Sequence, residues 1–397
     1  MKGINPYELI IEGLVFSLLL FPGFFPSPYI SLAFVVVILA VLCVVSKRYP
    51  NTAMRREILQ FRRIGWVFLV MLFCLLLLQS MFVLEIDRVA MQRSVVLMAQ
   101  IYVSVGFFSV LSSGLINLKC VVKAASLFCI LFSVYYLIHV LLNGIPDGRS
   151  SIFGAFSSNY CASILYLLFP VLFYYISKNK NNADSRKIVV RCYLALILSF
   201  FVILTTGSRT ALGMCVFIFG FINLFTKWDI KKVVKLIVAA VLGIIALFIL
   251  MDRVPAIQDS VIRALRVFTE SDVVKSDIRS LIWQVAMEKF EEYNHWLGSG
   301  SNHFMFYDIY EPPHNFVIEI LMSYGYVGLG LAALTHIVFV GRILCKRSKT
   351  KKVHILAICG AYMLTAYVQP FFSTSFNCGL SIWMTMCAIA LDDTVKA

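Results

Sequence analysis

The chain has 397 residues, of which 60% are hydrophobic and only 14% are charged. A soluble domain of this length needs far more polar surface, so the composition excludes an ordinary cytosolic enzyme, a disordered chain and a disulfide-stapled secreted module. The net charge of +14 does not indicate nucleic acid, because Lys and Arg in the cytosolic loops of a membrane protein produce the same excess. The composition predicts an all-α polytopic membrane protein.

The apolar runs, taken from the N-terminus, predict about twelve membrane-spanning helices, since each span needs roughly twenty apolar residues. They cover residues 7–25, 28–45, 63–84, 94–116, 121–143, 159–177, 189–206, 209–226, 233–251, 314–341, 353–372 and 376–391. A basic residue, Lys2, followed by an apolar run is a pattern that signal peptides share. No small-residue cleavage site follows it, so the run is expected to remain as an uncleaved span.

Positive charge orients these spans. With both termini in the cytosol, the predicted cytosolic segments hold most of the 35 Lys and Arg residues, as the positive-inside rule requires. The short external loops hold only Arg88, Arg93, Arg149 and Arg209. An odd number of spans would place a strongly basic loop outside.

One external segment, residues 252–313, is longer than the other loops and carries helical patterns of its own. Asp259 or Ser260 is placed to cap a first helix. A second helix is predicted over Asp277–Tyr293. Its apolar face, at about 100° per residue, collects Ile278, Leu281, Ile282, Val285, Ala286, Phe290 and Tyr293. The predicted organisation is nine spans in 1–251, an external loop domain in 252–313 and three spans in 314–397.

The eleven cysteines lie mostly inside apolar runs, and none falls between Asp252 and Pro313. Their spacing is not typical of metal ligands. We therefore expect free thiols that behave as small hydrophobic side chains.

Arg209 follows Ser208 at the outer face, where one apolar span ends and the next begins. Ser208 is expected to cap the new helix, so that free N–H groups and the positive end of the helix dipole lie beside a guanidinium. That combination binds phosphate. The alternative is that Arg209 only reaches the lipid headgroups.

Arg279 falls within the apolar face of the second loop helix, beside the positions of Trp283 and Phe290. A charge in such a place must be compensated. Arg279 is therefore expected to reach a ligand or the lipid interface, or to form an ion pair with Asp277 or another loop acid.

His314 follows two prolines that stop any incoming helix, so it is expected at a helix N-terminus facing outside. The helix dipole disfavours imidazolium there, and a neutral ring is what a general base needs. Metal binding is the weaker alternative, because the nearby His295 and His303 have no zinc-like spacing with it.

Glu319 lies one helical turn after Asn315, inside a predicted span where an ionised side chain costs roughly 2.5–3.5 kcal/mol. We expect it to orient the Asn315 side chain or to pair with Arg209. The glycines nearby have predicted structural roles. Gly298-Ser299-Gly300 would close the second loop helix, and Gly325, Gly328 and Gly330 would allow close helix packing.

The order of these motifs resembles the O-antigen ligase and polymerase superfamily. The resemblance is carried by Gly207-Ser208-Arg209-Thr210-Ala211, by Arg279 with Trp283, Phe290 and Gly298-x-Gly300, and by His314-Asn315 ahead of Gly325-x-x-Gly328. A weaker similarity lies in the stretch Phe153–Asn159, and the whole covers roughly residues 150–330. Such proteins are membrane transferases with about a dozen spans and one large external loop before the late His-bearing helix.

The resemblance implies glycosyl transfer from an undecaprenyl-pyrophosphate-linked oligosaccharide to an acceptor hydroxyl, without metal or cofactor, at the outer face of the bacterial inner membrane. Arg209 and Arg279 would stabilise the pyrophosphate leaving group, and His314 would activate the acceptor hydroxyl. Ser208, Asn315 and Glu319 would support substrate binding. The implied partners are the lipid-linked oligosaccharide, membrane lipids, a chain-length regulator and a flippase, with no nucleic acid.

Three other functions compete with the favoured one, a polymerase of O-antigen or another surface polysaccharide. A ligase would move finished chains onto the lipid A core of lipopolysaccharide, but Gly213 stands where ligases often carry Leu. A lipid-linked sugar flippase also fits about twelve spans, although the sequence shows no internal repeat. A scaffold protein would need none of the three candidate catalytic residues.

Overall fold

The computed structural model describes several separate parts of the chain. These are residues 12–13, 37, 40, 52–82, 117–143, 158–226, 278–292, 294–300, 315–345, 347–368 and 385–392. They are almost entirely α-helical, and none of them lies in a strand. The predicted all-α class is confirmed for this part of the chain. Two compact units are distinguished, one over residues 118–275 and 346–362 and one over residues 1–117, 276–345 and 363–397.

Five helical segments of the described residues are long and apolar enough to cross a membrane. They are Leu118–Val140, Cys161–Asn179, Ala183–Thr205, Arg209–Thr226 and Phe316–Leu344, and each coincides with a predicted span. The chain is thus a multi-pass membrane protein. The predicted spans 7–25, 28–45, 94–116, 233–251 and 376–391 lie wholly or mostly outside the described residues, so the count of about twelve stays a prediction.

The unit over residues 118–275 and 346–362 is built around α5 (Leu118–Asn143) and α8 (Arg186–Thr205), which pack along each other. Arg191 of α8 donates hydrogen bonds to the Ser126 hydroxyl and to the Lys123 carbonyl, both at 2.9 Å. Deeper in the pair, the hydroxyls of Ser133 and Ser199 lie 3.5 Å apart. These polar contacts help to set the register of the two helices.

One predicted span in this unit consists of two helices. The span 159–177 consists of α6 (Ser158–Tyr166) and α7 (Phe169–Asn179), because Pro170 lacks the N–H that would continue the first helix. The span 209–226 is α9 (Arg209–Thr226), with the predicted bounds. The predicted span 353–372 is α16 (Lys349–Val368), which begins earlier than expected.

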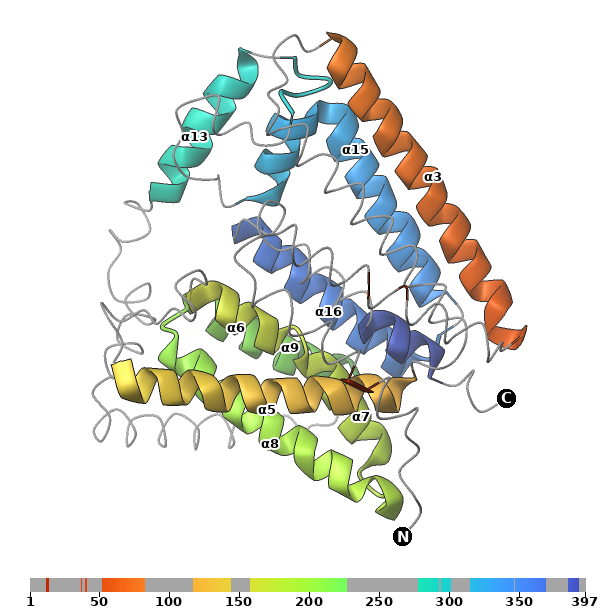
Figure 1. Ribbon diagram of the computed structural model, residues 1–397, viewed down its shortest axis with the longest axis vertical. Helices are drawn as coiled ribbons and strands as arrows, with labels where there is room; N and C mark the ends of the chain where they lie inside the picture. Colours follow the sequence, from red (N-terminus) through yellow and green to blue (C-terminus); the bar gives the residue numbers. More distant parts are fainter. Residues whose placement is uncertain are drawn as a thin grey trace. The chain divides into compact units, whose positions relative to one another are not determined.

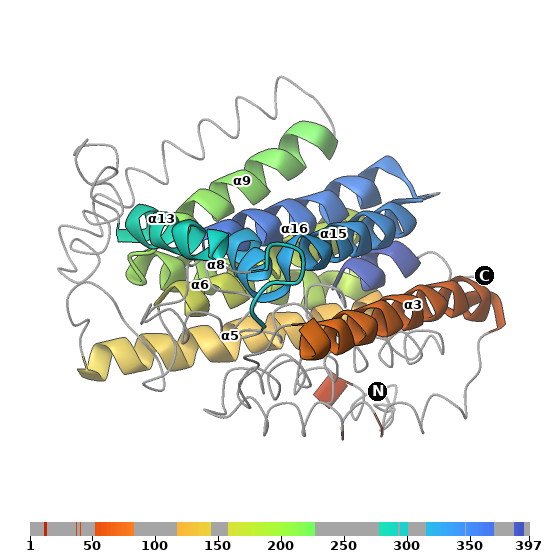
Figure 2. The ribbon, with the colours of Figure 1, turned by 90° about the horizontal axis from the view of Figure 1, so that it is seen from above.

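In the unit over residues 1–117, 276–345 and 363–397, α3 (Thr52–Phe82) and α15 (Phe316–Leu344) lie side by side (Figures 1 and 2). Leu72, Leu75 and Tyr324 are buried in their contact. The predicted span 63–84 is the apolar part of α3, which starts in the more polar stretch ahead of it.

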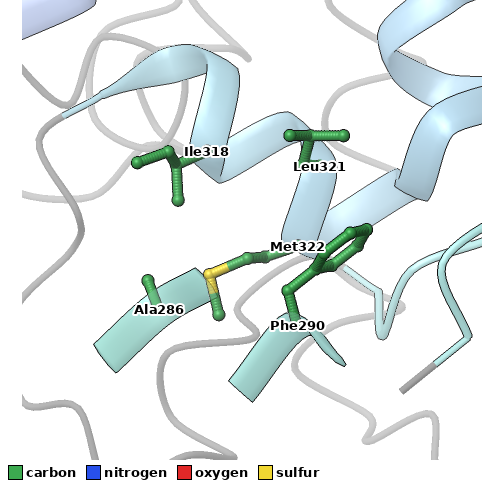
Figure 3. Packing of buried hydrophobic residues seen from close by; sticks show 5 residues of the cluster. All are labelled: Ala286, Phe290, Ile318, Leu321 and Met322. Atoms are coloured by element: carbon green, nitrogen blue, oxygen red, sulfur yellow. The ribbon is translucent and has the colours of Figure 1, made fainter. Parts of the chain in front are cut away.

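The second loop helix predicted over Asp277–Tyr293 is confirmed as α13 (Ile278–Glu291). Ala286 and Phe290 of α13 are buried against Ile318, Leu321 and Met322 of α15 (Figure 3). Trp283 and Met287 flank this cluster. The predicted face was therefore rotated too far, since it included Leu281, which is 59% exposed; packing on α15 selects only one side of the apolar stripe.

α15 is interrupted at Gly325, whose backbone has φ 63° and ψ −165°, and the helix bends sharply there (Figure 1). Two carbonyls that precede the break bond to the loop instead of to their own helix. The Ser299 N–H donates to the Met322 carbonyl at 2.8 Å and the Gly300 N–H donates to the Ser323 carbonyl at 2.9 Å. The loop thus replaces the helical hydrogen bonds that the break removes.

The same loop also accepts hydrogen bonds from the helix after the break. The Tyr326 N–H donates to the His295 carbonyl at 2.9 Å, and the Val327 N–H donates to the Trp296 carbonyl at 3.2 Å. The Asn294 side chain in turn accepts the Trp296 N–H at 3.0 Å and the Leu297 N–H. Residues 294–300, the docking segment, are therefore bonded to α15 on both sides of Gly325.

Two of these glycines, Gly298 and Gly325, have roles other than those predicted. Gly298 has φ 69° and Gly325 has φ 63°, and a Cβ on Gly298 would lie 2.6 Å from the Gly325 nitrogen. Gly298 does not close α13, which ends at Glu291, but lets the docking segment approach the break. Among the described residues, a Cβ on Gly330 would meet nothing within 4 Å, so close helix packing at Gly330 stays a prediction.

Gly325→Ala is expected to destabilise the protein by several kcal/mol, the sum of about 1–3 kcal/mol for a non-glycine residue held at this φ and ψ and the displacement of the Trp296 backbone from the new Cβ. Gly330→Ala is the matched control, and it should be neutral or stabilise by up to about 1 kcal/mol. Thermal unfolding in detergent measures both. Equal midpoints for the two variants would contradict the described break.

Candidate functional site

Arg209 directly follows a short turn that connects α8 to α9. α8 ends at Thr205, and Gly207 follows in the left-handed conformation with φ 60°, as is usual after a helix C-terminus. The Ser208 hydroxyl then accepts the Ala211 N–H at 3.3 Å. This bond confirms the prediction that Ser208 caps α9.

Arg209 is the first residue of α9, and its side chain is exposed, whereas Ser208 before it is buried. The first N–H groups of a helix have no partner within that helix, and the helix dipole adds positive potential at the same place. A guanidinium on this helix end can therefore bind an anion such as phosphate in two ways at once, through its charge and through its donor fork.

Asn315 is the N-cap of α15. Its Oδ1 accepts the Val317 N–H at 3.0 Å and the Ile318 N–H at 3.4 Å, and the residue is buried. The cap occupies the side-chain oxygen of Asn315, so the amide nitrogen is the atom able to donate to a substrate.

Glu319 lies in the first turn of α15 and is 2% exposed. Its N–H donates to the Asn315 carbonyl at 2.9 Å. Helical N–H groups hold the Asn315 side-chain oxygen, so Glu319 could orient this side chain only through its amide nitrogen, and that role stays a prediction. A carboxylate in the first turn is stabilised by the positive helix end, which makes a buried acid less costly at this position.

The other two predicted catalytic positions are described less fully. Arg279 is the second residue of α13, and the description covers its backbone alone. His314 lies outside the described residues and directly precedes Asn315 in the sequence.

The starts of α13 and α15 lie at the same end of their contact. Figure 3 shows Ala286 beside Ile318 on one side and Phe290 beside Leu321 on the other, so the two helices run in the same direction. Ala286 lies eight residues after the start of α13, and Ile318 lies three residues after Asn315, so the start of α13 extends beyond Asn315 along the shared direction. Arg279 and Asn315 therefore belong to neighbouring helix ends, and His314 directly precedes Asn315 in the sequence. Arg209 belongs to the other compact unit.

No group of three or more His, Cys, Asp or Glu residues within the described ranges is arranged to hold a metal ion. Transfer without metal stays a prediction from the family resemblance.

Gln79 of α3 is a residue that the sequence reasoning missed. Its amide is buried, and it donates to carbonyls of the docking segment and of α15. One amide inside an otherwise apolar span was the available signal, since a buried polar group requires partners.

Comparison with known families adds one finding. Residues 194–333 match the family model described as O-antigen ligase, which confirms the resemblance drawn from the motifs. The matched stretch contains all the residues predicted for the site, namely Ser208, Arg209, Arg279, His314, Asn315 and Glu319. The search of curated proteins gives no match to the chain.

Proposed function

We propose that this chain, a member of the O-antigen ligase and polymerase superfamily, transfers a glycan from undecaprenyl pyrophosphate to an acceptor sugar hydroxyl. The family match supports surface polysaccharide glycosyl transfer at a multi-pass membrane protein. The lipid carrier, the acceptor and the site residues belong to the proposal. Its expected location is the bacterial inner membrane, with both termini in the cytosol and the site on the outer face.

The proposed reaction is a displacement at the anomeric carbon of the donor sugar. The acceptor hydroxyl gives its proton to the neutral imidazole of His314 while its oxygen bonds to the anomeric carbon. The bond from that carbon to the pyrophosphate oxygen breaks, and undecaprenyl pyrophosphate leaves with the electron pair. Arg209 and Arg279 stabilise the negative charge that develops on the leaving group.

One observation carries this proposal most directly. Arg209 is exposed at the first position of α9, next to a confirmed N-cap at Ser208, so a guanidinium and a helix N-terminus are presented together, as a pyrophosphate requires. The neighbouring starts of α13 and α15 support the same chemistry, because two parallel helix dipoles place their positive ends at Arg279 and at Asn315, the residue that follows His314 in the sequence.

Within the superfamily, we propose the polymerase activity, which joins repeat units, over the ligase activity. Gly213 of α9 supports this choice, since the residue at this place is often Leu in ligases. The ligase alternative uses the same donor and the same three residues, and it differs in its acceptor, the lipid A core.

Purified protein supplied with undecaprenyl-pyrophosphate-linked repeat units is expected to yield a ladder of longer glycans on gels. A parallel reaction offers the lipid A core as the acceptor. Transfer to the lipid A core with no ladder would establish the ligase. Absence of product in both reactions, with protein that unfolds cooperatively, would refute glycosyl transfer.

A further inference from the structure

A single buried amide joins α3 to the interrupted part of α15. Gln79 is 1% exposed. Its Nε2 donates to the Leu297 carbonyl at 2.5 Å and to the Ser323 carbonyl at 2.8 Å. One side chain thus reaches both the docking segment and the helix that the docking segment holds.

The two hydrogen bonds of Gln79 lie in apolar surroundings, which makes them important. Leu72, Leu75 and Tyr324 form a buried apolar cluster at this contact, with Leu297 packed against it. An amide in such a place is costly unless its donors are used. Removing the Gln79 amide takes this donor from the Leu297 carbonyl and leaves the Ser323 carbonyl with the Gly300 N–H.

The half-helix from Phe316 to Tyr324 depends on contacts of this kind for its direction. Its end is held by the docking segment, through the Ser299 N–H and hydroxyl on the Met322 carbonyl at 2.8 and 3.0 Å, and by Gln79 on the Ser323 carbonyl. Its side is held by α13. Since the left-handed residue Gly325 interrupts the helix, the rest of α15 does not dictate the direction of the half-helix.

We propose that Gln79 is a positioning residue for glycosyl transfer. By holding the carbonyls of Leu297 and Ser323, it sets the direction of the half-helix that begins at Asn315, directly after His314. This inference rests on the proposed function, because it assigns Gln79 an effect that acts through His314. Gln79 does not touch the substrate in this account.

Gln79→Met tests the proposal, because Met has the length of Gln and similar helix propensity but donates no hydrogen bond. The kcat is expected to fall by up to about 100-fold, the effect of a misplacement of about 1 Å, while the KM for the lipid-linked donor stays within about twofold. Gln284→Met is the matched control. Gln284 is exposed and donates to Glu288 on its own helix at 2.9 Å, so its kcat should equal that of the wild type.

A second measurement separates positioning from a general structural role. In a His314→Ala background, Gln79→Met should cause no further loss of rate, because the base that it positions is gone. If Gln79→Met caused a general structural defect, the double variant would instead lose rate by the product of the two single losses. If Gln79→Met does not accumulate in membranes, Gln79→Asn replaces it in both measurements, and its shorter amide should give an intermediate loss.

The outcomes are distinct. A wild-type protein that makes no glycan product overturns the proposed function, and the positioning role with it. An active wild type with equal kcat for Gln79→Met and Gln284→Met overturns the positioning role alone. Multiplied losses in the His314→Ala background also overturn it.

Discussion

His314→Ala is expected to lower the rate of glycan transfer by about 10²–10⁴-fold, the usual contribution of a positioned general base. Donor binding should persist, because the pyrophosphate is held by other groups. Turnover of undecaprenyl-pyrophosphate-linked repeat units by purified protein measures the rate, and a binding assay with the same donor measures affinity. A wild-type rate in this variant would remove His314 from the mechanism.

His336→Ala, at a histidine of α15, provides the control. The His336 ring bonds through Nδ1 to the Ala332 carbonyl of α15 at 2.8 Å, so its loss should leave the rate unchanged. The wild-type rate should also rise between about pH 5 and 8, because a general base acts in its neutral form and imidazole loses its proton in this range. The residual rate of His314→Ala should lack this rise, and a flat wild-type profile would argue against the base.

Arg209→Ala is expected to lower the rate by about 100- to 1000-fold, the effect of removing one group that stabilises developing negative charge. Arg209→Lys should restore only part of the rate, because an ammonium keeps the charge but lacks the planar donor fork. Turnover of the lipid-linked donor is again the measurement.

The chain offers a closely matched control in Arg186→Ala. Arg186 is the exposed first residue of α8, as Arg209 is of α9, but the two lie at opposite ends of α8. Arg186 is therefore expected on the cytosolic face, and its loss should not change the rate. Equal losses in the two alanine variants would point to a general effect of surface charge.

The helices that the sequence predicted best are those with local start and stop signals. Gly207 and Ser208 determine the end of α8 and the start of α9 by left-handed backbone and capping chemistry alone. The bounds of α9 and the environment of Arg209 could therefore be predicted without knowledge of any neighbouring helix.

The break in α15 could not be predicted in this way. Inside an apolar run, Gly325 looks the same whether it allows close packing or a left-handed turn. The turn forms because residues 294–300 supply donors and acceptors on both sides of it, and that contact is tertiary. The exposure of Leu281 has the same origin, since only the contact with α15 decides which part of the apolar stripe of α13 is buried.

In the candidate site, too, local features could be predicted from the sequence and tertiary contacts could not. The roles of Ser208 and Asn315 as caps rest on neighbours two or three residues away, although for Asn315 the sequence predicted substrate support instead. The role proposed for Gln79 depends on two carbonyls far along the chain, and no local pattern identifies such partners.

The central claim is that Arg209, Arg279 and His314 act on one pyrophosphate at the outer membrane face. An experimental structure of the protein with undecaprenyl pyrophosphate bound would test it most directly. We predict both guanidinium groups within hydrogen-bonding distance of the pyrophosphate oxygens, and the imidazole beside the position that the anomeric carbon would occupy. A pyrophosphate bound elsewhere, or either arginine on the opposite membrane face, would contradict the claim.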